Sequence, residues 1–108
     1  MSIDGSCLCG ACSFSLDDEL SGVRYCHCSN CRKFSGTSPA AWAMAQSNKL
    51  HKSPGTDAQV AKFNSGRGIR CFCKSCGCAM WFESIEYPEV VGIPLGVLDT
   101  EILNKPEI

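Results

Sequence analysis

The chain has 108 residues, a formal net charge of −1, and 44% hydrophobic against 19% charged residues. This length favours a single domain over residues 1–108, and the composition supports a buried core and excludes a disordered chain. The nearly balanced charge excludes a bulk attraction to nucleic acid or to an anionic membrane surface, and no apolar run is long enough to span a membrane.

The N-terminal residues lack the basic and apolar regions of a secretory signal, so we expect a cytoplasmic protein. They carry the first of three clusters with the spacing Cys-x-Cys-x-x-Cys, formed by Cys7, Cys9 and Cys12. Apolar and polar residues alternate over Cys12–Leu16, which predicts a half-buried strand with Cys12 as a small core residue.

A second strand is predicted over Val23–Tyr25, directly before the second cysteine cluster. That cluster has the same spacing as the first and consists of Cys26, Cys28 and Cys31. A short helix is predicted over Asn30–Phe34, starting from a cap region at Ser29 and Asn30 and ending at Gly36.

Short apolar runs separated by glycine and proline turn signals predict six more strands. These are Ala40–Ala45, Val60–Asn64, Gly68–Phe72, Ala79–Glu83, Val90–Ile93 and Val97–Leu98. The third cysteine cluster falls within this series and consists of Cys71, Cys73 and Cys76, with Cys78 as the tenth cysteine. The expected architecture is therefore mainly β. The apolar stretch Val90–Leu98 fits either the core or a contact between copies, so the oligomeric state stays open.

The tight clustering of the ten cysteines favours metal binding over disulfides. A disulfide within Cys-x-Cys is strained, whereas thiolates that converge on one ion meet no such constraint. The segment Cys73-Lys74-Ser75-Cys76-Gly77 has the form of a tight metal-binding turn, or knuckle. Sulfur ligands suit zinc or iron–sulfur clusters. The spacing differs from the bacterial ferredoxin run, and the chain has more aromatic residues than a metallothionein, so we expect zinc.

A structural zinc takes four ligands, whereas a catalytic zinc takes three and keeps one open position. The simplest structural site joins the first cluster to the third cluster through Cys7, Cys9, Cys73 and Cys76. This site would tie the start of the chain to its later half, as a small domain needs.

The second cluster then supplies three thiolates and leaves one position open, through Cys26, Cys28 and Cys31. We therefore expect two zinc ions per chain, one structural and one catalytic. Cys71 or Cys78 is an alternative fourth ligand of the second site. The favoured interpretation places Cys12, Cys71 and Cys78 in the core or beside the metal.

The motifs around these cysteines follow one another in a specific order. They are Gly5-Ser6-Cys7-Leu8-Cys9-Gly10, Cys26-His27-Cys28-Ser29-Asn30-Cys31-Arg32-Lys33, the Trp42 strand, Phe72-Cys73-Lys74-Ser75-Cys76-Gly77 and Gly96-Val97-Leu98-Asp99. In this order they resemble the glutathione-dependent formaldehyde-activating enzyme family, also called the GFA or centromere protein V domain family. The resemblance extends from about Gly5 to Asp99.

The resemblance implies an Mss4-like, or β-tent, fold of stacked antiparallel sheets with zinc knuckles. It implies the same structural zinc on four cysteines and a second zinc at an active site formed by Cys26, Cys28 and Cys31. The activity implied is synthesis of S-(hydroxymethyl)glutathione, a carbon–sulfur lyase class, with a glutathione-like thiol as the small-molecule substrate.

The chain departs from the family pattern in its three extra thiols and in its end at Asn104–Ile108, where most members continue. We expect the second departure to affect the substrate pocket more than the metal sites. Arg32 and Lys33 meet substrate carboxylates, lower the charge of the thiolate cluster or face solvent, and Trp42 is expected in the core.

Two other functions are compatible with the sequence. The first is a non-catalytic zinc module that binds a protein partner, and a fourth cysteine at the second site would favour it. The second is a methionine sulfoxide reductase of the B type, because Arg24-Tyr25-Cys26 is similar to its catalytic motif. A reactive redox cysteine should not be a zinc ligand, which disfavours this second alternative.

Overall fold

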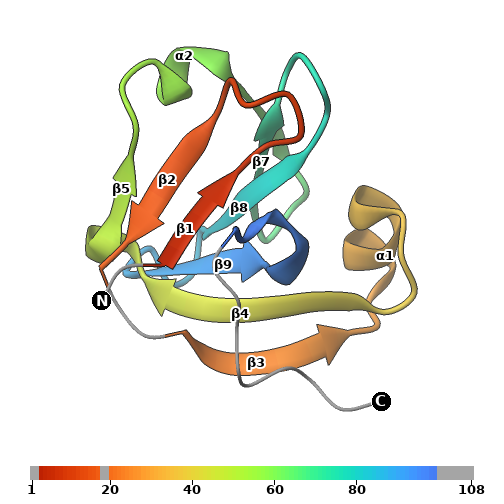
Figure 1. The fold of residues 1–108 in the computed structure, drawn as a ribbon. Helices are drawn as coiled ribbons and strands as arrows, with labels where there is room; N and C mark the ends of the chain where they lie inside the picture. The colour runs from red at the N-terminus through yellow and green to blue at the C-terminus, as the bar shows by residue number, and fades with distance from the viewer. Residues whose placement is uncertain (1–2, 18–19, 100–108) are drawn as a thin grey trace.

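Two antiparallel sheets pack against each other in the computed structural model, which describes residues 3–17 and 20–99 (Figure 1). The strands are β1 (Ile3–Ser6), β2 (Ser13–Leu16), β3 (Ser21–Cys26), β4 (Ala40–Gln46), β5 (Leu50–Lys52), β6 (Val60–Asn64), β7 (Gly68–Cys73), β8 (Ala79–Ser84) and β9 (Val90–Pro94). The helices are α1 (Ser29–Ser35) and α2 (Thr56–Gln59), with 3-10 turns η1 (Ser47–Lys49) and η2 (Leu95–Val97). The segment Asn104–Ile108 lies outside the described residues.

The smaller sheet has the strand order β1-β2-β5, and the larger sheet has the order β3-β4-β9-β8-β7-β6. The paired strands in both sheets are antiparallel. The expected mainly β fold of stacked antiparallel sheets is therefore confirmed. Within the described residues, no helix is long and apolar enough to cross a membrane.

All but one of the predicted strands are confirmed, with ends that shift by up to two residues. The strand predicted at Val97–Leu98 is wrong. The chain turns there into η2, and Leu98 makes only an isolated bridge with Gly5. The sequence also gave no signal for β1 and β5, because short polar or glycine-containing segments have low strand propensity and form only beside a partner.

The larger sheet separates two apolar clusters, one on each face. The face toward the smaller sheet holds the main core, where Phe14 of β2 meets Trp81 of β8 edge to face at a centroid distance of 6.1 Å. Val91, Ile93 and Val97 are buried in the same cluster. The stretch Val90–Leu98 therefore contributes to the core.

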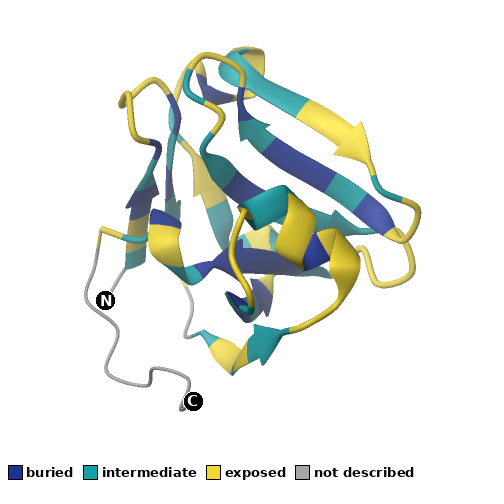
Figure 2. Cartoon of the chain, turned by 90° about the vertical axis from the view of Figure 1, so that its right-hand side faces the viewer, coloured by how far each residue is buried: buried dark blue, intermediate teal, exposed yellow. Residues whose placement is uncertain are grey.

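Helix α1 lies on the opposite face of the larger sheet and is mostly exposed (Figure 2). It is confirmed near the predicted bounds, but its N-cap is Cys28 and not Ser29 or Asn30. The Cys28 Sγ accepts a hydrogen bond from the Cys31 N–H at 3.4 Å, which satisfies a donor that a helix start otherwise leaves free. The helix ends at Gly36 as predicted. Capping by Cys28 thus places a sulfur at the start of α1.

Candidate metal centres

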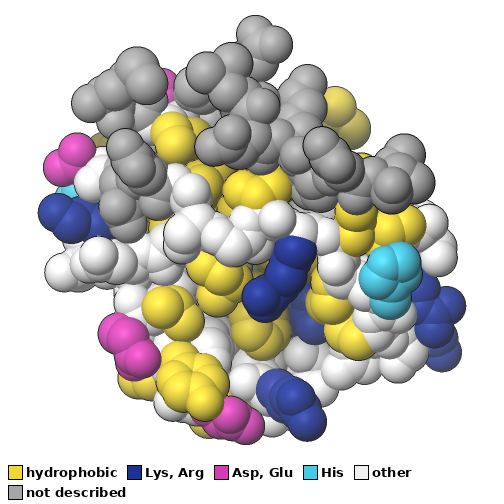
Figure 3. Space-filling view, turned by 90° about the horizontal axis from the view of Figure 1, so that it is seen from below, with side chains coloured by type: hydrophobic (Ala, Val, Ile, Leu, Met, Phe, Trp, Pro, Cys, Tyr) yellow, Lys and Arg dark blue, Asp and Glu magenta, His cyan; other side chains and the backbone are white. Residues whose placement is uncertain are grey.

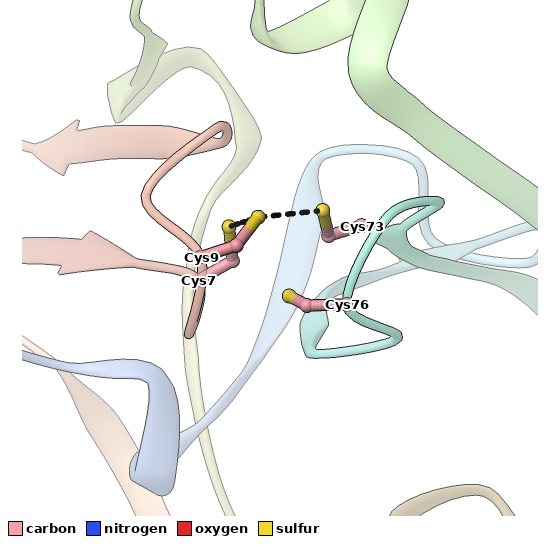
Figure 4. A group of neighbouring side chains, drawn as sticks. All are labelled: Cys7, Cys9, Cys73 and Cys76. Carbon is pink, nitrogen blue, oxygen red and sulfur yellow. Dashed lines mark hydrogen bonds between the residues drawn. The ribbon is translucent and has the colours of Figure 1, made fainter.

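The first centre forms where two loops meet beside the main core. One loop follows β1 and the other follows β7, and their sulfurs point toward one another (Figure 4). The four sulfurs all lie within 4.8 Å of one another and belong to Cys7, Cys9, Cys73 and Cys76. The structure thus brings together the four cysteines that the sequence grouped by counting.

The sulfur spacing at the first centre fits a tetrahedral zinc ion. Tetrahedral Zn–S bonds of about 2.3 Å place neighbouring sulfurs about 3.8 Å apart. The Cys9 Sγ lies 3.6 Å from the Cys7 Sγ and 3.7 Å from the Cys73 Sγ. This donor set therefore needs little rearrangement to enclose zinc.

Each loop of the first centre is a tight turn closed by a glycine. The Gly10 N–H donates to the Cys7 carbonyl at 3.1 Å, and the Gly77 N–H donates to the Cys73 carbonyl at 2.8 Å. Both glycines have positive φ, 82° and 76°, a conformation that costs other residues energy. The expected knuckle at Cys73–Gly77 is present, and the loop at Cys7–Gly10 matches it.

Backbone N–H groups stabilise negative charge on sulfur at the first centre. Hydrogen bonding from the Cys76 backbone lowers the pKa of Cys73 to about 5, against burial, which acts in the other direction. The Cys12 N–H also donates to the Cys7 Sγ at 3.3 Å. These donors favour the thiolate form that metal binding requires.

The second centre lies on the other face of the larger sheet, at the start of α1. Cys26 ends β3, Cys28 caps the helix and Cys31 belongs to its first turn. The Cys26 Sγ lies 3.4 Å from the Cys28 Sγ and 2.9 Å from the Cys31 Sγ. To surround zinc, the closer pair must separate by about 0.9 Å. Cys28 is exposed and Cys26 half-exposed, so these two side chains have room to adjust.

The three thiols of the second centre have different surroundings. Hydrogen bonding from the Cys31 side chain, and then from its backbone N–H, lowers the pKa of Cys28 to about 7. Burial raises the pKa of Cys31 to about 12, and the neighbouring thiols Cys26 and Cys28 act in the same direction. The exposed Cys28 thiol is therefore easier to ionise than the buried Cys31 thiol before a metal binds.

Arg70 is a residue of the second centre that the sequence analysis missed. It comes from β7 and is only 6% exposed. Its two terminal guanidinium nitrogens lie 3.8 and 3.7 Å from the Cys31 Sγ. A charged residue in the otherwise apolar predicted strand Gly68–Phe72 was the available signal.

The second centre opens onto a pocket of about 360 Å³. The pocket runs across the larger sheet, since its lining includes Arg24 of β3, Phe82 of β8 and Arg70 of β7. The face seen from below carries separate basic side chains set among hydrophobic ones (Figure 3). Arg67 also lines the pocket, and the ion pairs found among the described residues involve neither Arg24 nor Arg67. The lining is thus mainly apolar, and its three arginines against one acidic residue, Glu86, give it a net positive charge.

The three extra cysteines do not join the second centre within the part of the chain that the structure describes. Cys12 and Cys71 are fully buried in the main core, and burial raises the pKa of each thiol to about 12. Cys78 packs at the edge of the same core, and burial raises its pKa as well. Three sulfurs therefore make up the second group, as the favoured interpretation expects.

Other residues singled out in the sequence lie at the margins of the second centre. Trp42 is buried with Cys31 and also forms part of the pocket wall, so it belongs to the core and to the pocket at once. Arg32 is exposed and donates to the His27 carbonyl at 3.1 Å. Neither Arg32 nor Lys33 lines the pocket.

Comparisons with known proteins agree with this architecture. A family model described as "Glutathione-dependent formaldehyde-activating enzyme" matches residues 2–108. A protein of Halomonas elongata, provisionally named as such an enzyme, is 29% identical over 99% of this chain and 72% of its own length. The crystal structure of a Rhodobacter sphaeroides protein superposes with a TM-score of 0.75 at 26% identity, covering 95% of this chain and 97% of that one.

Proposed function

The chain belongs to the glutathione-dependent formaldehyde-activating enzyme family, and from this premise we propose that it is a zinc-dependent enzyme of the carbon–sulfur lyase class. Its substrates are a glutathione-like thiol and formaldehyde, and its product is the S-hydroxymethyl adduct. The observation that carries the proposal is the second centre, where three converging sulfurs open onto a pocket.

The two centres have separate roles in this proposal. Four sulfurs would enclose zinc completely at the first centre, which would make that metal structural. At the second centre, three sulfurs would hold the metal and would leave a position for a ligand from the pocket. Zinc bound there would keep a substrate thiol in its thiolate form at neutral pH.

The reaction is an addition in which a C–S and an O–H bond form while the S–H bond and the C=O π bond are broken. The thiol sulfur adds to the carbonyl carbon of formaldehyde, so a C–S bond forms and the C=O π bond opens. The new alkoxide takes up a proton equivalent to the one that the thiol lost, and the reverse sequence releases formaldehyde. The pocket walls from Trp42 and Phe82 would exclude water, while Arg24 and Arg67 would attract the carboxylates of a glutathione-like thiol.

The sulfur count distinguishes this proposal from a non-catalytic zinc module. A purely structural role at the second centre would favour a fourth protein ligand, and Cys71 and Cys78 were the candidates. Cys71 is buried in the main core on the other face of the larger sheet, Cys78 packs at the edge of that core, and neither belongs to the sulfur group of the second centre. The three-sulfur group beside a pocket therefore supports catalysis over simple scaffolding. A thiol-dependent reaction also suits the reducing cytoplasm that we propose as its location.

The test is the rate at which the protein exchanges formaldehyde with glutathione, measured by NMR exchange spectroscopy on the zinc-loaded chain. We expect the wild-type protein to exceed the spontaneous rate, and Cys28→Ser to fall back to it. Cys71→Ala is the matched control, since it removes a buried thiol outside both centres, and it should keep the wild-type rate. Equal rates for the wild-type protein and Cys28→Ser would refute the proposal.

A further inference from the structure

Arg70 carries a buried charge that has no carboxylate partner. Its side chain is 6% exposed, and its Nε donates to the Ser65 Oγ at 3.2 Å. The ion pairs found among residues 3–17 and 20–99 are Lys52–Asp57 and Lys62–Glu83, so neither involves Arg70. A guanidinium stays charged in proteins, and burial of an uncompensated charge is strongly unfavourable. This arginine therefore needs a counter-ion near its terminal nitrogens.

Aromatic rings surround the Arg70 guanidinium and fix its position. Its central carbon lies 4.6 Å from the centroid of Phe82, 5.6 Å from Phe34 and 5.8 Å from Trp42. Such rings favour a cation over their faces and exclude water from around it. They do not supply a negative charge, so they hold the guanidinium without neutralising it.

The group that faces the Arg70 terminal nitrogens is the Cys31 sulfur, at 3.7 and 3.8 Å. Serine and asparagine side chains nearby are neutral, and the one acidic residue that lines the pocket, Glu86, is exposed. When the second centre is loaded, three thiolates around a divalent cation leave a net negative charge. That charge is the available partner for Arg70.

We propose that Arg70 is the built-in counter-ion of the three-sulfur centre, and that its charge allows the open position to accept an anionic ligand. Without Arg70, a fourth thiolate would add to an already negative centre. With it, the entering thiolate meets a centre that is close to neutral. This proposal deepens the proposed function, because it states that the substrate binds as an anion and names the residue that selects for it. Arg70 is a positioning residue, because it acts on the open position through its contact with the Cys31 sulfur.

The test compares two small probes that differ in charge. The probes are 2-mercaptoethanol, which binds metal as a thiolate, and imidazole, which binds as a neutral ligand. Binding is followed by the visible absorption of cobalt-substituted protein, whose first centre is already closed by four sulfurs. The proteins compared are wild type, Arg70→Gln and Arg70→Lys. Arg32→Gln is the control, since it removes an exposed cation close in sequence to Cys31.

We expect Arg70→Gln to weaken 2-mercaptoethanol binding by about tenfold or more and to change imidazole binding by less than about twofold. Arg70→Lys should recover most of the thiolate affinity, and Arg32→Gln should match wild type. If Arg70 contributed only to the shape of the site, its loss would weaken the binding of both probes equally. Lysine at this position would then not restore binding. Either of those results, or unchanged thiolate binding in Arg70→Gln, overturns the proposal.

If Arg70→Gln loses metal from the second centre, the zinc affinities of the three proteins replace the probe titration. They are measured by competition with a chromophoric chelator, and retention of one zinc in native mass spectrometry shows that the fold is intact. The counter-ion role predicts that Arg70→Lys binds the second zinc more tightly than Arg70→Gln. Equal loss in both variants contradicts it.

These measurements are independent of turnover. The wild-type protein could bind 2-mercaptoethanol with the predicted Arg70 dependence and yet not accelerate formaldehyde exchange. That result would refute the proposed activity and support the counter-ion role. A wild-type centre that binds no thiolate would overturn the counter-ion role directly.

Discussion

The two faces of the larger sheet carry cysteine centres built in opposite ways. The first centre joins loops that are far apart in the sequence, with Cys9 and Cys73 separated by 64 positions. The second centre takes all its sulfurs from six consecutive residues at the end of β3 and the start of α1, residues 26–31. One centre therefore brings distant parts of the chain together, whereas the other is formed by a single short segment.

The surroundings of the two centres also differ. Cys7 and Cys73 are buried beside the main core, and backbone N–H groups complete their environment. Each centre has one exposed cysteine, Cys9 in the first and Cys28 in the second, but the second has only one buried cysteine. The second centre also has a buried arginine beside that cysteine and opens onto a pocket. We infer that the first centre contributes mainly to stability and the second mainly to chemistry.

Cys73→Ser should have the largest effect on folding. It removes one of four sulfurs that join the two halves of the chain, and the loss of a structural metal destabilises a small domain by about 4 kcal/mol or more. Denaturant unfolding, with native mass spectrometry for zinc content, would measure the change. A variant that unfolds at the wild-type denaturant concentration would show that the first centre does not hold the fold together.

Stepwise removal of metal should distinguish the centres without any mutation. A chelator of moderate strength should take zinc first from the second centre, which has three sulfurs and opens onto a pocket, leaving the far-ultraviolet circular dichroism unchanged. A strong chelator should then empty the first centre and unfold the chain. Mass spectra and circular dichroism recorded on the same samples test this order. Simultaneous loss of both metals with the fold would contradict the comparison.

Cys28→Ser should reverse the pattern of Cys73→Ser. We expect thiol-adduct turnover to fall by about 100-fold or more, because one of three sulfurs at the open centre is lost. Stability should change by less than about 1 kcal/mol, since an exposed serine can still cap α1. Parallel turnover and unfolding assays measure both effects. A large loss of stability would show that the second centre also holds the fold together.

Cys71→Ala should have the smallest effect. This thiol is buried in the main core, shares a sheet face with Cys73 and lies outside both sulfur groups. Removing its sulfur leaves a small cavity, which should cost about 1 kcal/mol. Two zinc ions and the wild-type turnover should remain. Loss of one zinc in this variant would assign Cys71 to a metal centre and would contradict the grouping of the sulfurs into two separate centres.

Most of what could be predicted about the cysteines and the strands came from the spacing of residues close together in the sequence. The Cys-x-Cys and Cys-x-x-Cys-Gly spacings constrain sulfurs within a few residues, so the two knuckles and the cluster at residues 26–31 follow from short-range geometry. Strands β6 and β4 also carry clear apolar patterns between turn signals. By contrast, β1 forms only because β2 offers it a partner, and its own residues indicate no strand.

Long-range packing sets which face of the larger sheet each side chain of β7 lies on. In β7, Cys71 and Cys73 point toward the main core, whereas Arg70 and Phe72 face α1. Alternation along a strand predicts two faces but not what covers them. The contact between Arg70 and Cys31 spans 39 positions and arises because α1 lies against β7. Local spacing therefore indicated the short-range sulfur pairs and the cluster at residues 26–31, whereas the grouping of Cys7 and Cys9 with Cys73 and Cys76 came from counting ligands. The buried charge beside the second centre depends on long-range packing, which no local pattern encodes.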